Sequence, residues 1–162
     1  MSSFNALCRM AVLAAFVLAG CGFTPVYAPD GAAGDLRGAI AFAAPDTVEG
    51  FDLRGRLEDR LGRVQTRDYD LTVTLDITEV ALAITSAQDI NRYNVVGDAG
   101  WTLATPAGDT LLTGTVDTFT SYSANNTTVA TLEAEQDARA RLAVALADLI
   151  VSQLLLRASE LP

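Results

Sequence analysis

The chain has 162 residues, half of them apolar, and a formal net charge of −9 from 20 acidic and 11 basic side chains. All its cations are arginine, and it contains no histidine. Because nonspecific nucleic-acid binding depends on neutralising phosphates, so acidic a chain is a poor nucleic-acid binder. The lack of histidine excludes Ser-His-Asp and Cys-His catalysis and removes the commonest zinc ligand.

The first twenty residues have the pattern of a secretory signal peptide. Arg9 precedes an apolar run at residues 10–19, which is shorter than the about 20 residues that a bilayer-spanning helix needs. Its length suits the apolar region of a signal peptide. The run ends in Leu18-Ala19-Gly20-Cys21, which resembles a lipobox. That resemblance implies cleavage between Gly20 and Cys21, a diacylglyceryl thioether on the Cys21 sulfur, and a palmitate-type acyl chain on the new amino terminus.

The alternative is an ordinary signal peptide that happens to precede a cysteine, but all four lipobox positions fit. Two acyl chains are enough to hold a protein stably on a membrane. Gly22 follows the cysteine, whereas Asp at that position would resemble an inner-membrane retention signal. We therefore expect a lipid anchor on the periplasmic face of the outer membrane. Cys21 is the only mature cysteine, so an internal disulfide is excluded.

Three regions are predicted along the chain. Residues 1–20 are the cleaved lipoprotein signal peptide, and residues 21–35 form a lipidated N-terminal tether rich in glycine and proline. Residues 36–162 form a single α/β sandwich domain, which is long enough to bury its own core. Residues 142–156 are apolar but interrupted by polar side chains, so no further transmembrane segment is expected.

The domain begins with a weak predicted strand at residues 36–43. A short helix is expected next, at residues 51–64, because apolar side chains recur there with the period of one helical face. The side chains on that predicted face are Leu53, Leu57, Leu61 and Val64.

The clearest strand pattern covers residues 69–84. From Tyr69 to Ile77 apolar side chains alternate with Asp and Thr, which is typical of a half-buried strand. After Glu79 the apolar positions change parity, to Val80, Leu82 and Ile84. This change predicts a β-bulge or bend near residues 78–79.

Two further strands follow, at residues 90–103 and 111–122. Turns are expected at residues 86–89 and at residues 106–109, where Pro, Gly and Asp gather. Trp101, the single tryptophan, alternates with apolar neighbours. This position favours a place in the core over a ligand platform.

A long final helix is predicted at residues 128–158, with acidic side chains early and Arg157 late, an order that complements the helix dipole. The elements follow the order β-α-β-β-β-α. The predicted fold is therefore α+β, a two-layer sandwich of a four-stranded sheet with two helices on one face. Thr and Asp side chains would cover the other face. The expected buried side of the final helix is formed by Leu132, Ala138, Leu142, Leu146, Leu149 and Leu156.

The sequence offers no reaction centre. Phosphate-binding glycine motifs are absent, and Asp70 and Asp76 would lie about 20 Å apart on one strand, too far for a glycosidase pair. We expect no enzyme activity, cofactor or metal. Arg92 and Tyr93, at the start of a strand, are candidate ligand or partner contacts, because arginine binds phosphates and carboxylates well. The alternative for Arg92 is a solvated surface charge.

Four segments together resemble one family. They are residues 21–27 (CGFTPVY), residues 92–94 (RYN), residues 118–122 (TFTSY) and residues 134–141 (AEQDARAR). Their order, and the predicted layout of strands and helices, is similar to that of LptE, the lipopolysaccharide-assembly lipoprotein. The resemblance extends over essentially the whole mature chain.

This resemblance implies a plug and assembly partner of the outer-membrane β-barrel LptD, which together with LptE places lipopolysaccharide in the outer leaflet. It also implies lipopolysaccharide as a candidate ligand. The strong acidity of the chain favours the plug role and leaves any lipopolysaccharide contact to local arginines such as Arg92. The alternatives are another envelope lipoprotein accessory to a lipid-transport system, and an anchored hydrolase that uses Asp70 or Asp76.

Overall fold

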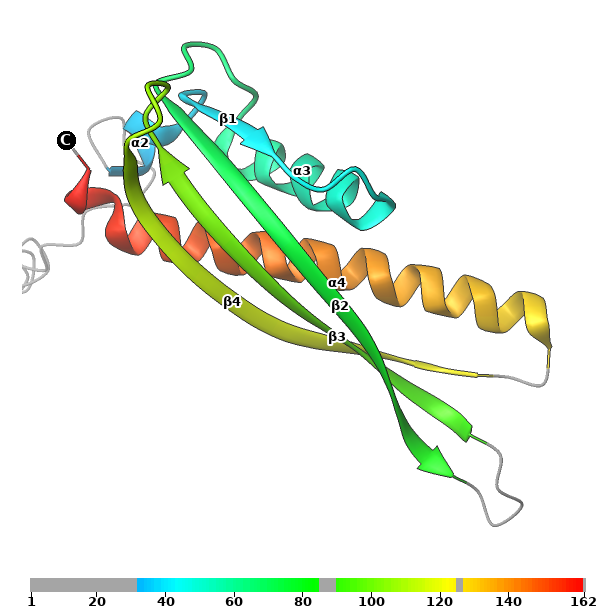
Figure 1. Ribbon diagram of the computed structural model, residues 1–162. Coiled ribbons are helices and arrows are strands. Elements are labelled where there is room, and N and C mark those ends of the chain that lie inside the picture. Colours follow the sequence, from blue (N-terminus) through cyan, green and yellow to red (C-terminus); the bar gives the residue numbers. More distant parts are fainter. Residues whose placement is uncertain (1–31, 85–89, 125–126, 162) are drawn as a thin grey trace, which may run out of the picture.

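The computed structural model describes residues 32–84, 90–124 and 127–161. The elements in chain order are α2 (Ala32–Leu36), β1 (Ile40–Ala43), α3 (Val48–Leu61), β2 (Tyr69–Ile84), β3 (Ile90–Ala104), β4 (Thr110–Ser123), α4 (Thr128–Arg157) and the 3-10 turn η1 (Ala158–Glu160). Figure 1 shows a long twisted sheet whose β2–β3 end extends beyond the helices.

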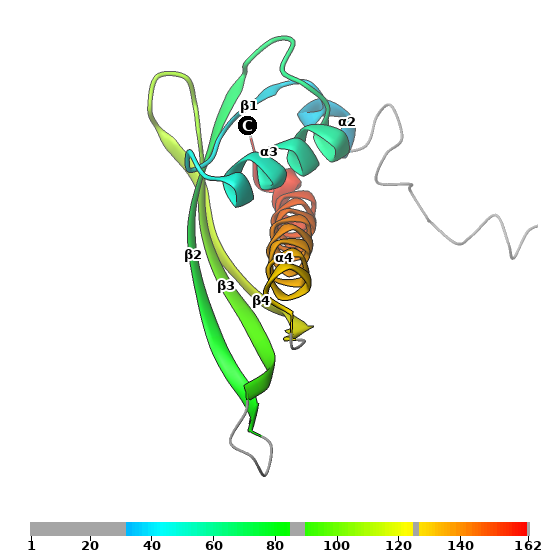
Figure 2. The ribbon, with the colours of Figure 1, turned by 90° about the vertical axis from the view of Figure 1, so that its right-hand side faces the viewer.

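The four strands form one sheet in the order β1-β2-β3-β4. β1 pairs with β2 in parallel, and β2, β3 and β4 are consecutive antiparallel neighbours. Figure 2 shows α3 and α4 on the same side of this sheet. The α+β, two-layer fold with two helices on one face is therefore confirmed. We call the sheet face without helices the open face.

The first strand is shorter than predicted. It begins at Ile40, and residues 36–39 are not extended, because Ala32–Leu36 forms helix α2 and Gly38 turns the chain with φ of 77°. The backbone N–H of Gly38 donates to the carbonyl of Leu61 at 2.8 Å, which ties this turn to the end of α3. Leu36 is buried at the end of a helix rather than in a strand.

Helix α3 begins and ends three residues earlier than predicted, and its caps explain the difference. The Thr47 side chain accepts a hydrogen bond from the Gly50 N–H at 3.1 Å, an N-cap. The helix ends before Gly62, whose φ of 82° suits glycine. Three of the predicted apolar positions are buried, but Val64 lies beyond the helix and is 49% exposed.

The bulge predicted at residues 78–79 is wrong. Pairing between β2 and β3 continues in register through Thr78 and Glu79, and shifts only between Ala81 and Ile84. The change of parity has another cause. Val80 stays on the open face with the Thr and Asp side chains before it, and it is exposed. The apolar residue therefore marks an uncovered surface rather than a register change.

The buried side of α4 was predicted only in part. Ala138, Leu142 and Leu146 are buried, but Leu132, Leu149 and Leu156 are exposed. α4 is apolar and long enough to cross a membrane by composition, so apolar side chains occur on several of its faces and periodicity alone cannot choose among them. The face that is buried in the structure is formed by Ala138, Leu142, Ala143, Leu146, Ala147, Ile150, Val151 and Leu154.

Trp101 lies in the core, as predicted. Its side chain is 2% exposed, and its indole N–H donates to the Gln153 Oε1 of α4 at 3.0 Å. This bond satisfies the one polar group of the ring inside the sandwich. Trp101 therefore joins the sheet to α4.

One carboxylate of α4 binds two arginines of α3. Asp148 of α4 accepts hydrogen bonds from Arg56 at 3.1 Å and from Arg60 at 2.7 Å, both from α3. All three side chains are about one third exposed. Arg56 binds in the two-pronged geometry that guanidinium and carboxylate favour.

Candidate partner-binding surfaces

The predicted anchor, Cys21 with its cleavage neighbour Gly20, lies outside the described residues, as do most of the tether and the 86–89 turn. The lipid attachment and the region boundaries stay predictions. The candidate sites that the structure places lie on the sheet and between the helices.

Arg92 and Tyr93 have different surroundings, although they are neighbours. Arg92 is exposed and pairs across the strands with Ser123 of β4. Tyr93 lies on the helix side and stacks on Tyr122, with ring centroids 5.2 Å apart and planes 11° from parallel. Arg92 is therefore accessible to a ligand or partner, whereas one face of Tyr93 is already occupied.

Tyr122 lies at the edge of the core, near the carboxylates of Glu79 and Glu135. Its side chain is 7% exposed. Burial, followed by a hydrogen bond with Glu79 and by the charges of Glu79 and Glu135, raises the pKa of Tyr122 to about 12. The phenol is therefore neutral at physiological pH and serves as a hydrogen-bond donor to the carboxylate.

Arg139 of α4 stands among three carboxylates from three elements. Its guanidinium lies 2.9 Å from Glu135, 3.6 Å from Glu49 of α3 and 3.9 Å from Glu79 of β2. Burial alone would lower the pKa of Arg139, but the hydrogen bond to Glu135 and the three acidic charges raise it. This cluster links both helices to β2, and its charges are already engaged, which indicates a structural role.

The open face carries a row of three aspartates. Asp76 of β2 lies opposite Asp98 of β3, which lies opposite Asp117 of β4. All three are exposed. Like charges directly opposite one another destabilise a sheet, so a cation beside this carboxylate row would relieve the repulsion.

An apolar patch adjoins the carboxylate row, toward the end of the sheet that extends beyond the helices. Val80 and Leu82 of β2 are 44% and 53% exposed, and Phe119 of β4 is 61% exposed. Val96, half-buried, lies between Thr78 and Phe119 in the strand order. Exposed apolar clusters of this kind mark interaction surfaces.

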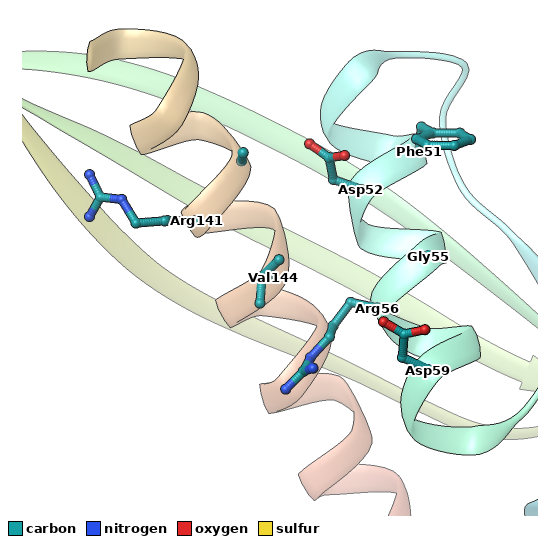
Figure 3. Close-up of a pocket in the computed structure, with 8 residues that line it drawn as sticks. Phe51, Asp52, Gly55, Arg56, Asp59, Arg141 and Val144 are labelled. Atoms are coloured by element: carbon teal, nitrogen blue, oxygen red, sulfur yellow. The ribbon is translucent and has the colours of Figure 1, made fainter. Parts of the chain in front are cut away.

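A groove between α3 and α4 is hollowed at two places, of about 500 Å³ and about 580 Å³. Figure 3 shows the first, where Arg56 reaches from α3 toward α4 and Asp52 and Val144 flank the space. The linings mix carboxylates with arginines and a few apolar side chains. They place no nucleophile beside a base.

The carboxylates considered for hydrolysis do not form a pair. Arg67 hydrogen-bonds Asp70 at 2.8 Å and 3.1 Å, and this contact lowers the pKa of Asp70. Asp76 belongs to the carboxylate row instead. Within residues 32–84, 90–124 and 127–161, no group of three or more acidic, histidine or cysteine side chains could hold a metal ion.

Sequence reasoning missed both the Arg139 cluster and the carboxylate row. The row depends on the register of two hairpins, which the unknown turn geometry leaves open in sequence. The cluster depends on where α3 and α4 rest on the sheet. In the sequence, the row's only signal was the spacing of single Asp residues in three predicted strands.

The model of the family LptE, described as lipopolysaccharide-assembly, matches residues 39–154. The chain belongs to the LptE family. This match covers nearly all of the described sandwich and confirms the resemblance drawn from the sequence. An LptE-family chain is a lipopolysaccharide-assembly lipoprotein, which places it in the cell envelope. No curated protein matches the chain.

Solved lipoprotein structures share the fold of this LptE-family chain. A protein from Caulobacter crescentus CB15 described as a lipoprotein is 24% identical, with a TM-score of 0.65 over 80% of this chain and 98% of its own. The minor lipoprotein of Acinetobacter baumannii is 14% identical, with a TM-score of 0.56 over 73% and 90%. Rare lipoprotein B of Shewanella oneidensis is 12% identical, with a TM-score of 0.54 over 71% and 92%.

Proposed function

We propose that this LptE-family lipoprotein is the plug and assembly partner of the β-barrel LptD in lipopolysaccharide transport to the outer leaflet. The observation that carries the proposal is the family match over residues 39–154. Cys21 would anchor the domain to the periplasmic face of the outer membrane. The chain would act by binding and position, without enzymatic chemistry or a cofactor.

Two structural features support a binding role. The open face presents the carboxylate row and the apolar patch, so a large surface is available to a partner. The β2–β3 end extends past the helices (Figure 1), which gives the domain a narrow end suited to entering a barrel.

The test is co-purification from solubilised outer membrane. Affinity-tagged full-length chain is expressed in its own bacterium, and LptD is quantified by mass spectrometry in the eluate. We expect LptD in near-equimolar amount, and we expect depletion of the chain to reduce folded LptD. Tagged chain recovered from the outer membrane without LptD would contradict the proposal. Recovery of an inner-membrane transporter in its place would favour the accessory-lipoprotein alternative.

Lipopolysaccharide contact through Arg92 is a finer part of the same proposal. The exposed guanidinium could bind a lipid A phosphate in two-pronged geometry. Arg92→Ala should weaken lipopolysaccharide binding by about tenfold, the loss of one charge-assisted contact, in a fluorescence titration of purified protein. Arg54→Ala on α3 is the matched control and should leave binding unchanged. Equal affinities for Arg92→Ala and wild type would reject this contact.

A further inference from the structure

The two long edges of the sheet differ in whether their outward backbone groups are already hydrogen-bonded. Side chains of α4 donate to three outward carbonyls of β4: Arg157 to Thr113 at 2.8 Å, Gln153 to Thr115 at 3.1 Å and Arg141 to Ser121 at 3.3 Å. These bonds occupy acceptors that another strand would need. Shielding of this kind is one way in which sheets avoid adding strands.

The other edge is open along most of its length. β1 pairs with β2 only as far as the Ala43–Thr72 pair. From Val73 to Ala81, no described strand lies on that side of β2. This length spans about 30 Å. We call this open segment of β2, Val73 to Ala81, the β2 lane.

The β2 lane also has few of the features that protect an edge, since Asp76 and Glu79 are its only charged residues. β2 pairs with β3 in unbroken register through Ala81, so no bulge bends the lane away. Its nine residues include neither proline nor lysine, and most favour β-structure. Unpaired N–H and C=O groups on a regular strand form a template for another strand.

We propose that the β2 lane is a strand-addition site for an extended segment of another polypeptide that carries basic residues among apolar ones. The inference is independent of the barrel assignment, because it rests on the edge and its charges. Main-chain hydrogen bonds to β2 would hold the segment, and its alternate side chains would lie on the open face.

The carboxylate row identifies the charge of the occupant. The carboxylate row begins at Asp117 of β4 and ends at Asp76 in the β2 lane, so the next position in the row would lie on the added strand. A Lys or Arg there would relieve the repulsion among like charges. The exposed side chains of Val80 and Leu82, farther along β2, provide an apolar seat for the same segment.

A second copy of this chain does not fit the β2 lane. The only charged residues between Val73 and Ala81 are Asp76 and Glu79. Pairing two β2 strands would therefore add a second Asp76 to the open face, and the β2 lane of the second copy carries no cation to offset it, in a chain whose net charge is −9. A basic segment from a different protein supplies the missing charge.

The direct test uses the purified mature chain and a synthetic nine-residue peptide in which Lys alternates with Val and Thr. Amide hydrogen exchange is measured by NMR with and without saturating peptide. Alternate amides between Val73 and Ala81 should exchange at least about tenfold more slowly, because new hydrogen bonds protect them. A peptide of the same sequence with alternate amides N-methylated keeps the charge and should lose this protection.

Three results would overturn the inference. The first is unchanged exchange in the β2 lane at saturating peptide. The second is equal protection by the N-methylated peptide, which would indicate attraction by charge alone. The third is a dimer of the chain in sedimentation velocity that protects the β2 lane without any peptide, which would make a second copy the occupant.

Matched charge variants locate the peptide on the sheet. A strand added at the β2 lane would lie one strand spacing, about 5 Å, from Asp76 but about 14 Å from Asp117, and screening at physiological salt acts over about 8 Å. Asp76→Asn should therefore lower the affinity for the peptide about three- to tenfold, while Asp117→Asn should leave the affinity nearly unchanged. A larger effect of Asp117→Asn would place the peptide at β4 and overturn the inference.

Discussion

Two glycines in the strands leave room for neighbouring side chains: Gly97 for Leu142 of α4, and Gly114 for the ring of Trp101. A methyl group on Gly97 would stand 2.9 Å from Leu142 of α4. One on Gly114 would stand 2.6 Å from two ring atoms of Trp101 and 2.8 Å from the amide oxygen of Gln153. Glycine weakens a strand locally, and here it makes room for the ring and the helix.

Gly114→Ala should destabilise the protein by about 1–3 kcal/mol, the usual cost of overpacking a filled core. The added methyl must displace the Trp101 ring or break its bond to Gln153. The measurement is urea unfolding followed by Trp101 fluorescence.

Gly55→Ala is the matched control for Gly114→Ala. A methyl at Gly55, within α3, would meet nothing within 4 Å, and alanine favours a helix over glycine by about 1 kcal/mol. This variant should be more stable than wild type. Equal stability of the two variants would contradict the packing argument.

Tyr122 should make the folded state less stable at alkaline pH. The unfolded phenol ionises near its ordinary pKa of about 10, whereas the folded one keeps its proton to about 12. Between these values the unfolded state binds fewer protons, so stability falls as pH rises. Tyr122→Phe should flatten this part of the stability curve. An unchanged slope between about pH 10 and 12 would show that the folded pKa is not raised.

At the scale of elements, the ends of α3 and its attachment to α4 follow from single side chains. Thr47 begins the helix, Gly62 ends it, and Asp148 holds it against α4 through Arg56 and Arg60. The caps follow local rules, and the sequence could have revealed them. The link to Asp148 joins residues about 90 positions apart, so only the packed structure reveals it.

Asp148→Ala should destabilise the protein by about 1–2 kcal/mol, because the half-buried guanidinium groups of Arg56 and Arg60 both lose their contact with this carboxylate. Asp137→Ala, which breaks the exposed pair with Arg141 within α4, should cost less than about 0.5 kcal/mol. Thermal unfolding by circular dichroism compares the two. Similar losses for both variants would mean that Asp148 acts as an ordinary surface charge.

At the scale of the whole molecule, the anchor and the domain have separate tasks. Cys21 would hold the chain on the membrane, while the sandwich presents its open face and its β2 edge. The family match covers the sandwich, and the anchor is a prediction from the lipobox.

Radiolabelled palmitate tests the anchor. The wild-type chain should be labelled and should fractionate with the outer membrane, and Cys21→Ala should be neither labelled nor anchored. Cys8→Ala is the matched control, since Cys8 would leave with the predicted signal peptide, and it should be labelled normally. Label retained by Cys21→Ala would refute the anchor.

The sequence by itself determined the order of the four strands and the two long helices, the α+β class, the burial of Trp101 and the Thr and Asp side chains of the open face, but not the apolar patch on that face. These features depend on periodicity and composition, which are local. Only the tertiary structure decided which side of α4 is buried, because that helix is apolar on several sides. It also decided that Asp76, Asp98 and Asp117 form one row and that one sheet edge is shielded while the other is open, because register and edge contacts join residues distant in the chain.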